Sequence, residues 1–138
     1  MSESPIEELL GAMDGMDVEA VVALFEPEAR LVSADGQRAE GTQAVREVIS
    51  AFIATLRSTT HRITAQWHVD NAWIAEVDAS YELRDWLQLN ALPRAVVLRE
   101  GPAGIADVRF YGAHEQQLSD HPTGGEGMWV GERWIPPL

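Results

Sequence analysis

Apolar and polar side chains alternate most clearly over residues 61–86. At the start of this stretch polar residues separate the odd-numbered positions His61, Ile63, Ala65, Trp67 and Val69. A second alternation runs from Trp73 to Leu83, and Asp70-Asn71, two residues that favour turns, lies between the two runs. A period of two is typical of strands that bury one face. The pattern therefore predicts a long antiparallel hairpin.

The alternation leaves two registers open for this hairpin. A three-residue loop, Asp70-Asn71-Ala72, would pair odd with odd positions and place Tyr81 opposite His61. A two-residue loop, Asp70-Asn71, would pair odd with even positions, because a shift of one residue reverses every side chain. In this second register, the side chains of Glu76, Asp78 and Ser80 would lie on the same face as His61. The first register is preferred, since it keeps two carboxylates away from apolar neighbours.

Helical periodicity dominates the chain before the hairpin. Ser4-Pro5-Ile6-Glu7 has the form of a capping box with proline at the first helical position, and it predicts a helix that ends near Gly15. A second helix is predicted from Val18 to Phe25, and Pro27 is expected to prevent it from continuing. The third and clearest helix opens at Gly41-Thr42. Its apolar stripe, at 3.6-residue spacing, contains Ala44, Val45, Val48, Ile49, Phe52, Ile53 and Leu56.

Three further strands are predicted around these elements. A short one covers residues 29–33, before the third helix. Two follow the hairpin, Leu87 to Arg99 and Ile105 to Gln116, and Pro93 indicates an edge position or a bulge in the first of them. This order predicts an α+β fold, in which three N-terminal helices cover one face of a curved mixed sheet that is mostly antiparallel.

Residues 1–118 are predicted to form one domain, and residues 119–138 a C-terminal extension. The extension is rich in glycine and proline and reads as irregular, yet it contains Trp129 and Trp134. A disordered tail has little reason to keep two tryptophans. We expect it to pack on the domain or on a dimer partner.

The amino-acid composition argues against several classes of function for this protein. The net charge of −12 argues against binding nucleic acid or anionic membranes. The chain of 138 residues has no cysteine, which excludes thiol nucleophiles and disulfides. All ten basic residues are arginine, so Schiff-base and pyridoxal-phosphate chemistry, which need a lysine amine, are excluded. No apolar run is long enough to span a bilayer, and the acidic start is unlike a secretory signal, so a cytoplasmic protein is expected.

We expect neither a metal nor a cofactor. The four histidines form no HxH or HExxH pattern, so a metal site is not predicted. No GxGxxG sequence or Walker-type phosphate loop occurs.

Several stretches resemble the nuclear transport factor 2-like superfamily, in particular its SnoaL-like and ketosteroid-isomerase-like branch. They are MDVEAVVALFEPEARLV, EGTQAVREVISAF, the strand that contains His61, and GIADVRFYGAHEQ. The similarity covers roughly residues 5–117. It implies a cone-shaped fold in which the helices and the concave sheet face enclose an apolar pocket for a small apolar or aromatic molecule. The superfamily contains isomerases, dehydratases, cyclases and epoxide hydrolases, and also non-catalytic modules.

The resemblance also shows which chemistry this chain lacks. The positions of the ketosteroid isomerase tyrosine and two acids fall on Leu9, Ser33 and Ala95, so steroid isomerisation of that type is not expected. The Asp-Arg-Asp arrangement of the epoxide hydrolases has its nearest match in Glu76-Val77-Asp78, without the arginine. His61 stands where a histidine of scytalone-dehydratase-like relatives acts on the substrate, and imidazole can act as acid or base near neutral pH.

These observations predict a cofactor-independent isomerase, dehydratase or cyclase. His61 is the candidate general acid or base and Tyr81 the donor to a developing oxyanion, while Asp78 is the partner of His61 in the second register. The expected pocket residues are Phe52, Trp67, Trp73, Val108 and Phe110, with His114 near the mouth.

The alternative is a non-catalytic module that binds a small hydrophobic ligand or serves dimerisation. A polar pair within hydrogen-bond reach inside the pocket would favour catalysis, and a wholly apolar lining would favour binding alone. The resemblance also implies a homodimer through the outer sheet face, where apolar area is expected from Ile74, Val96 and Leu98.

Overall fold

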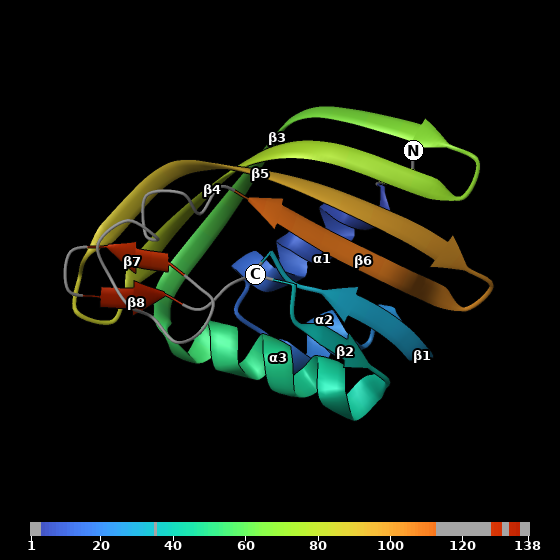
Figure 1. Cartoon of the computed structure of the whole chain (residues 1–138), viewed down its shortest axis with the longest axis horizontal. Coiled ribbons are helices and arrows are strands. Elements are labelled where there is room, and N and C mark those ends of the chain that lie inside the picture. Colours follow the sequence, from blue (N-terminus) through green and yellow to red (C-terminus); the bar gives the residue numbers. More distant parts are fainter. Residues whose placement is uncertain (1–3, 35, 113–127, 131–132, 136–138) are drawn as a thin grey trace.

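A computed structural model describes residues 4–34, 36–112, 128–130 and 133–135. The three helices are α1 (Pro5–Asp14), α2 (Val18–Val22) and α3 (Thr42–Ala54) (Figure 1). The strands of the main sheet are β1 (Phe25–Val32), β2 (Arg38–Glu40), β3 (Leu56–Val69), β4 (Ala72–Leu83), β5 (Gln88–Gly101) and β6 (Gly104–Gly112). A second, two-stranded sheet contains β7 (Met128–Val130) and β8 (Arg133–Ile135).

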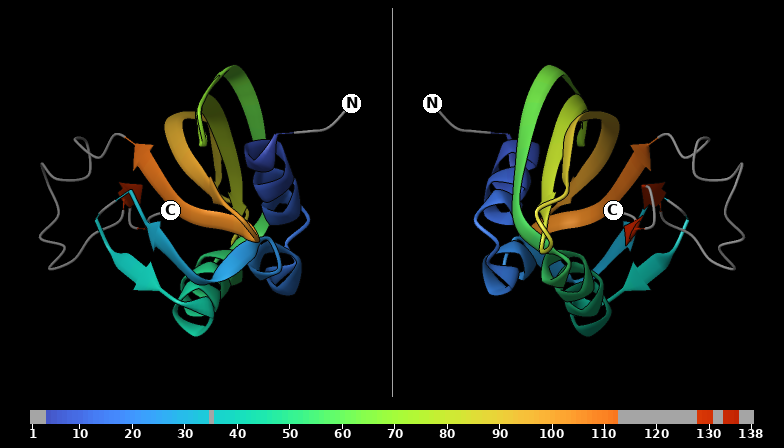
Figure 2. Two further views of the ribbon diagram at one scale, coloured as in Figure 1. Left: turned by 90° about the vertical axis from the view of Figure 1, so that its right-hand side faces the viewer. Right: turned by 90° about the vertical axis from the view of Figure 1, so that its left-hand side faces the viewer.

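The six strands of the main sheet are arranged in the order β2-β1-β6-β5-β4-β3. Only β1 and β6 are parallel among the described neighbours, so the sheet is mixed and mostly antiparallel. Figure 2 shows that it curves around the helices; α1 packs on β3, β4 and β5, and α3 contacts α2, β1 and β2. The predicted α+β architecture is confirmed. No helix in the described part of the chain is long and apolar enough to cross a membrane.

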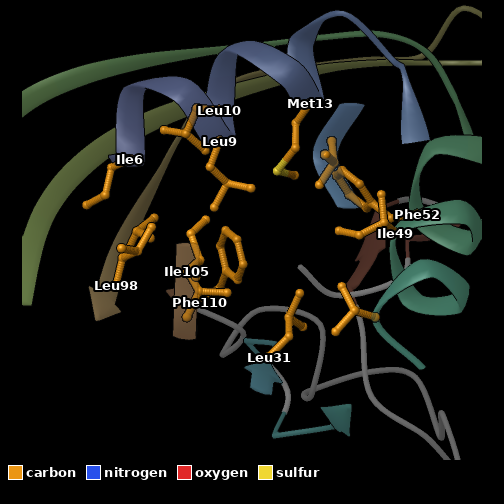
Figure 3. Close-up of a cluster of buried hydrophobic side chains, with 14 of the residues drawn as sticks. Ile6, Leu9, Leu10, Met13, Leu31, Ile49, Phe52, Leu98, Ile105 and Phe110 are labelled. Atoms are coloured by element: carbon orange, nitrogen blue, oxygen red, sulfur yellow. The ribbon is translucent and has the colours of Figure 1, made fainter. Parts of the chain in front are cut away.

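The core lies between the helices and the inner face of the sheet (Figure 3). The Ser4 hydroxyl caps α1 by accepting from the Glu7 N–H at 3.0 Å, as the capping box predicts. The helix then buries an apolar stripe of Ile6, Leu9, Leu10 and Met13, and α3 buries Val45, Ile49, Phe52 and Ile53. Each large side chain contributes about 1.5–3 kcal/mol by leaving water. These two stripes fix both helices over the sheet.

The hairpin register combines the two alternatives. Next to the Asp70-Asn71 turn, odd residues pair with even ones, as Trp67 does with Ile74. A β-bulge at Thr64 then inserts one residue, and beyond it odd pairs with odd. His61 therefore lies opposite Ala79 on the inner face. The preferred single register is wrong because the bulge restores the apolar inner face on both sides of the bend.

Proline positions and the end of the chain also differ from the predictions. Helix α2 ends at Val22, and Pro27 lies inside β1 instead of ending the helix. Proline has no backbone N–H to donate, and Pro27 lies where the β1–β6 pairing is irregular, between Phe25 and Arg30. The tail, predicted to be irregular, contains the β7–β8 hairpin. How the tail packs lies outside the described residues.

Candidate active site

His61 is held by both oxygens of one aspartate. The His61 ring Nδ1 lies 2.6 Å from Asp14 Oδ1, and the His61 backbone N–H donates to Asp14 Oδ2 at 3.0 Å. The imidazole side chain is 6% exposed and that of Asp14 28%. An ionised carboxylate only accepts hydrogen bonds, so the proton of the neutral imidazole resides on Nδ1. Nε2 is then the nitrogen that can accept a proton.

Helix α1 positions this aspartate, which is its last residue. At the other end of α1, the Ser4 hydroxyl donates to Gln66 Oε1 of β3 at 2.6 Å, and the Gln66 amide donates to Glu7 at 3.3 Å. Both ends of the helix are thus bonded to β3. The partial negative charge of a helix C-terminus adds to the carboxylate, and together they stabilise a positive charge on His61.

Asp14 is not among the site residues predicted from the sequence. An aspartate at a helix C-terminus is locally unfavourable, because the helix dipole repels it. Such a local conflict is a signal of a functional position. Its partner lies 47 residues away on another element, so the pairing itself is not visible in the sequence.

Tyr81 of β4 lies beside the histidine on the inner face. Its ring meets His61 edge to face, with centroids 6.3 Å apart, and Phe52 in the same way at 5.6 Å. Burial raises the pKa of the Tyr81 hydroxyl; the charge and hydrogen bond of the Arg94 guanidinium oppose this increase, and the charge of Asp14 adds to it. The phenol is therefore neutral near pH 7 and can donate a hydrogen bond.

Arg94 of β5 also faces inward. It pairs with Val77 and Gly112 and alternates with Val96 and Leu98, which are buried in the core. Its Nη1 donates to the Pro93 carbonyl at 3.0 Å. Arg94 is not among the predicted site residues either, although the alternation of residues 92, 94, 96 and 98 places one arginine on an otherwise apolar face.

Three of the predicted pocket residues, Phe52, Val108 and Phe110, are buried in the hydrophobic core. Trp73 is also on the inner face, but near the hairpin turn, where it stacks on His68 at 3.7 Å. Trp67 is on the outer face and 49% exposed, so its predicted place in the pocket wall is wrong.

Asp78 does not share a face with His61. It lies on the outer face, where Arg62 Nη2 donates to it at 3.1 Å. The bulge at Thr64 causes this. Beyond it, His61 pairs with Ala79 on the inner face, and Asp78 pairs with Arg62 on the outer face. Val96 and Leu98, predicted on the outer face, point into the core. His114 lies outside the described residues.

The described residues contain no group of three His, Cys, Asp or Glu side chains that could hold a metal ion. The groups brought together on the inner face are instead an imidazole, a carboxylate, a phenol and a guanidinium. They can accept a proton, stabilise the resulting cation and donate to an oxygen.

Comparison with known proteins supports the fold. Among solved structures, the chain is similar to a protein with a ketosteroid-isomerase-like fold from Catenulispora acidiphila in complex with trimethylamine, with TM-score 0.73, 17% identity and coverage of 82% of this chain and 88% of that one. The chain is also similar to SalBIII, an epoxide hydrolase/cyclase-like enzyme with a role in pyran ring formation in the polyether salinomycin. The TM-score is 0.69 and the identity 16%, and the alignment covers 79% of this chain and 88% of SalBIII. A protein named as a SnoaL-like polyketide cyclase from Shewanella denitrificans gives TM-score 0.72, 9% identity and coverage of 84% and 92%.

No curated protein matches the sequence. The model of the SnoaL-like domain matches residues 6–120, which is most of the chain. The protein therefore belongs to the SnoaL-like domain family.

Proposed function

We propose that the protein is a cofactor-independent enzyme that isomerises, dehydrates or cyclises a small apolar or aromatic molecule by general acid–base chemistry. The observation that carries this proposal is the 2.6 Å contact between His61 Nδ1 and Asp14 Oδ1, which leaves Nε2 to exchange a proton. Membership of the SnoaL-like family supports it. So do the similar structures named as a polyketide cyclase and an epoxide hydrolase/cyclase-like enzyme.

The catalytic cycle begins with His61 Nε2 taking a proton from carbon or from a hydroxyl of the substrate. Asp14 is a positioning residue that stabilises the imidazolium. The neutral phenol of Tyr81 donates to the oxygen on which charge develops. The imidazolium then returns the proton to a different atom, which isomerises or cyclises the substrate, or to a departing hydroxyl, which leaves as water.

The binding-module alternative is less well supported. Burying the His61 imidazole against a carboxylate costs free energy of desolvation, and apolar side chains of similar size would line a hydrophobic pocket without that cost. A polar pair within hydrogen-bond reach favours catalysis.

The test uses a panel of β-keto esters, β-hydroxy ketones and epoxides. His61→Gln is expected to lower kcat by about 10²–10⁴-fold on any member that the wild type converts. His68→Gln, which changes an exposed histidine of the same strand, is the matched control and is expected to leave kcat unchanged. Wild-type turnover by a folded His61→Gln protein would refute the mechanism. Binding of apolar ligands without conversion of any member would favour the alternative.

We further propose that the protein forms a homodimer through the outer face of the sheet, where large apolar or aromatic side chains are exposed. Trp67, Ile74 and Tyr111 are 49%, 36% and 49% exposed. Beside them the outer face is hollowed by about 570 Å³, between Thr64, Glu76, Pro93 and Tyr111 among others. Light scattering is expected to give about twice the chain mass of 15.2 kDa, and Trp67→Ser to lower it. A monomer mass for the wild type would contradict this.

A further inference from the structure

Two buried side-chain atoms in the described residues have no hydrogen-bond partner, and both are on the inner face. They are Thr59 Oγ1 on β3 and Arg94 Nε on β5. These strands flank β4, which carries Tyr81, and Thr59 lies directly opposite Tyr81. A buried polar atom without a partner destabilises a fold, so native proteins rarely keep one without a reason. The two atoms therefore mark the surroundings of Tyr81 as a place for a polar ligand.

Arg94 brings a positive charge to this place. None of the carboxylates in the described residues forms an ion pair with it, although the chain has 22 acidic residues and ten basic ones. Asp14, the carboxylate beside His61, is engaged with that histidine. The charge on Arg94 is balanced by no described acid, which is what a site for an anion requires.

Gly112 makes room for the guanidinium. A Cβ atom at this position would lie 2.6 Å from Arg94 Nη1 and 2.8 Å from its Cδ, closer than real Cβ atoms approach. The backbone φ of Gly112 lies outside the left-handed region, so any residue could adopt its conformation. Space for the arginine is therefore the physical reason for glycine here.

We propose that Arg94, beside Tyr81, forms a subsite for a carboxylate group of the substrate. The proposal rests on the proposed function and narrows it, because it makes the substrate of the His61 reaction an organic acid. A guanidinium offers Nε–H and a terminal N–H in parallel, and this fork matches the two oxygens of a carboxylate. Arg94 Nε is the buried donor that such a ligand would satisfy, and the Tyr81 hydroxyl adjoins it.

The test compares two probes of equal shape, 2-naphthoate and neutral 2-naphthamide, by calorimetry on the full-length protein. The wild type is expected to bind the naphthoate about tenfold more tightly than the amide. Arg94→Gln is expected to remove this preference without changing amide binding. Gly112→Ala keeps the charge but displaces the guanidinium, and it should weaken naphthoate binding as well. Arg99→Gln, an exposed arginine of the same strand, is the matched control.

Equal affinities for the two probes in the wild type, no binding of the naphthoate, or a preference kept in Arg94→Gln would each overturn the proposal. Arg94→Lys covers the case in which Arg94→Gln does not fold: it keeps the charge, loses the fork, and should retain only part of the preference. His61→Gln separates the two proposals. It is expected to bind the naphthoate as the wild type does; if it also keeps turnover, the mechanism fails and the subsite stands.

Discussion

His61 and Arg62 are neighbours on β3, and each pairs with an aspartate, but on opposite faces of the sheet. On the inner face, His61 Nδ1 is 2.6 Å from Asp14, and the two side chains are 6% and 28% exposed. On the outer face, Arg62 Nη2 is 3.1 Å from Asp78, and the side chains are 77% and 30% exposed. One aspartate comes from a helix bonded to β3 at both ends, the other from the adjacent strand.

The difference shows that location decides how strongly such a pair interacts, while the residue type decides whether it can exchange a proton. Water and salt screen the outer pair, which contributes little to stability. On the inner face the His61 imidazole is withdrawn from water while Asp14 stays 28% exposed, so the orientation of the imidazole is fixed and its interaction with the carboxylate is less screened. An aspartate can thus orient a buried imidazole on one face of the sheet and form an exposed, screened ion pair on the other.

The largest expected effect is on turnover. Asp14→Asn should lower kcat by about 10²–10⁴-fold, because the amide no longer holds the proton of His61 on Nδ1 or stabilises the imidazolium. Asp78→Asn makes the same chemical change in the outer pair and should leave kcat unchanged. Steady-state kinetics on a converted substrate measures both. Equal losses in the two variants would remove the functional distinction between the faces.

A smaller effect is expected on stability. Asp14→Asn should lower the free energy of unfolding by about 1–3 kcal/mol, since the buried imidazole and the His61 N–H lose a charged acceptor. Asp78→Asn should cost at most about 1 kcal/mol. Urea unfolding followed by circular dichroism measures the difference. If the outer variant were the less stable of the two, burial would not be the deciding factor.

The two tyrosines extend the comparison to alkaline pH. Burial raises the pKa of Tyr81 above its ordinary value of 10.0, so the folded protein keeps this proton where the unfolded chain loses it. The stability due to the neutral phenol is complete below pH 10.0 and is lost as the pH rises towards the folded-state pKa. The chain has no lysine to titrate in this range.

Tyr81→Phe should therefore remove part of the fall in the free energy of unfolding between about pH 9 and pH 11.5. Tyr111→Phe is the control, because Tyr111 is 49% exposed on the outer face. Urea unfolding over this pH range measures the slopes. A larger change of slope in Tyr111→Phe would contradict the assignment.

Sequence patterns predicted the parts of the fold that depend on local order. The Ser4 cap and the stripes of α1 and α3 were readable because their partners lie within a few residues. His61 was placed on the inner face by the same alternation that defines β3. The bulge at Thr64 was not readable, because Ile63-Thr64-Ala65 alternates as a regular strand does.

The rest of the site depends on contacts between distant segments. Asp14 meets His61 only after α1 has packed across β3, and Arg94 meets Tyr81 only through the pairing of β4 with β5. One inserted residue also decided which tryptophan faces outward, so Trp67 and Trp73, alike in the pattern, lie on opposite faces. Register and helix placement are therefore what the sequence alone left undetermined.

The central claim is that His61 Nε2 exchanges the proton while Asp14 keeps the other one on Nδ1. Long-range ¹H–¹⁵N correlation spectra of the neutral histidine rings test it most directly, with His68 as an exposed control in the same sample. We expect the neutral His61 ring to carry its proton on Nδ1 and none on Nε2, and Asp14→Asn to abolish this selectivity. A neutral His61 that carries its proton on Nε2 would contradict the account.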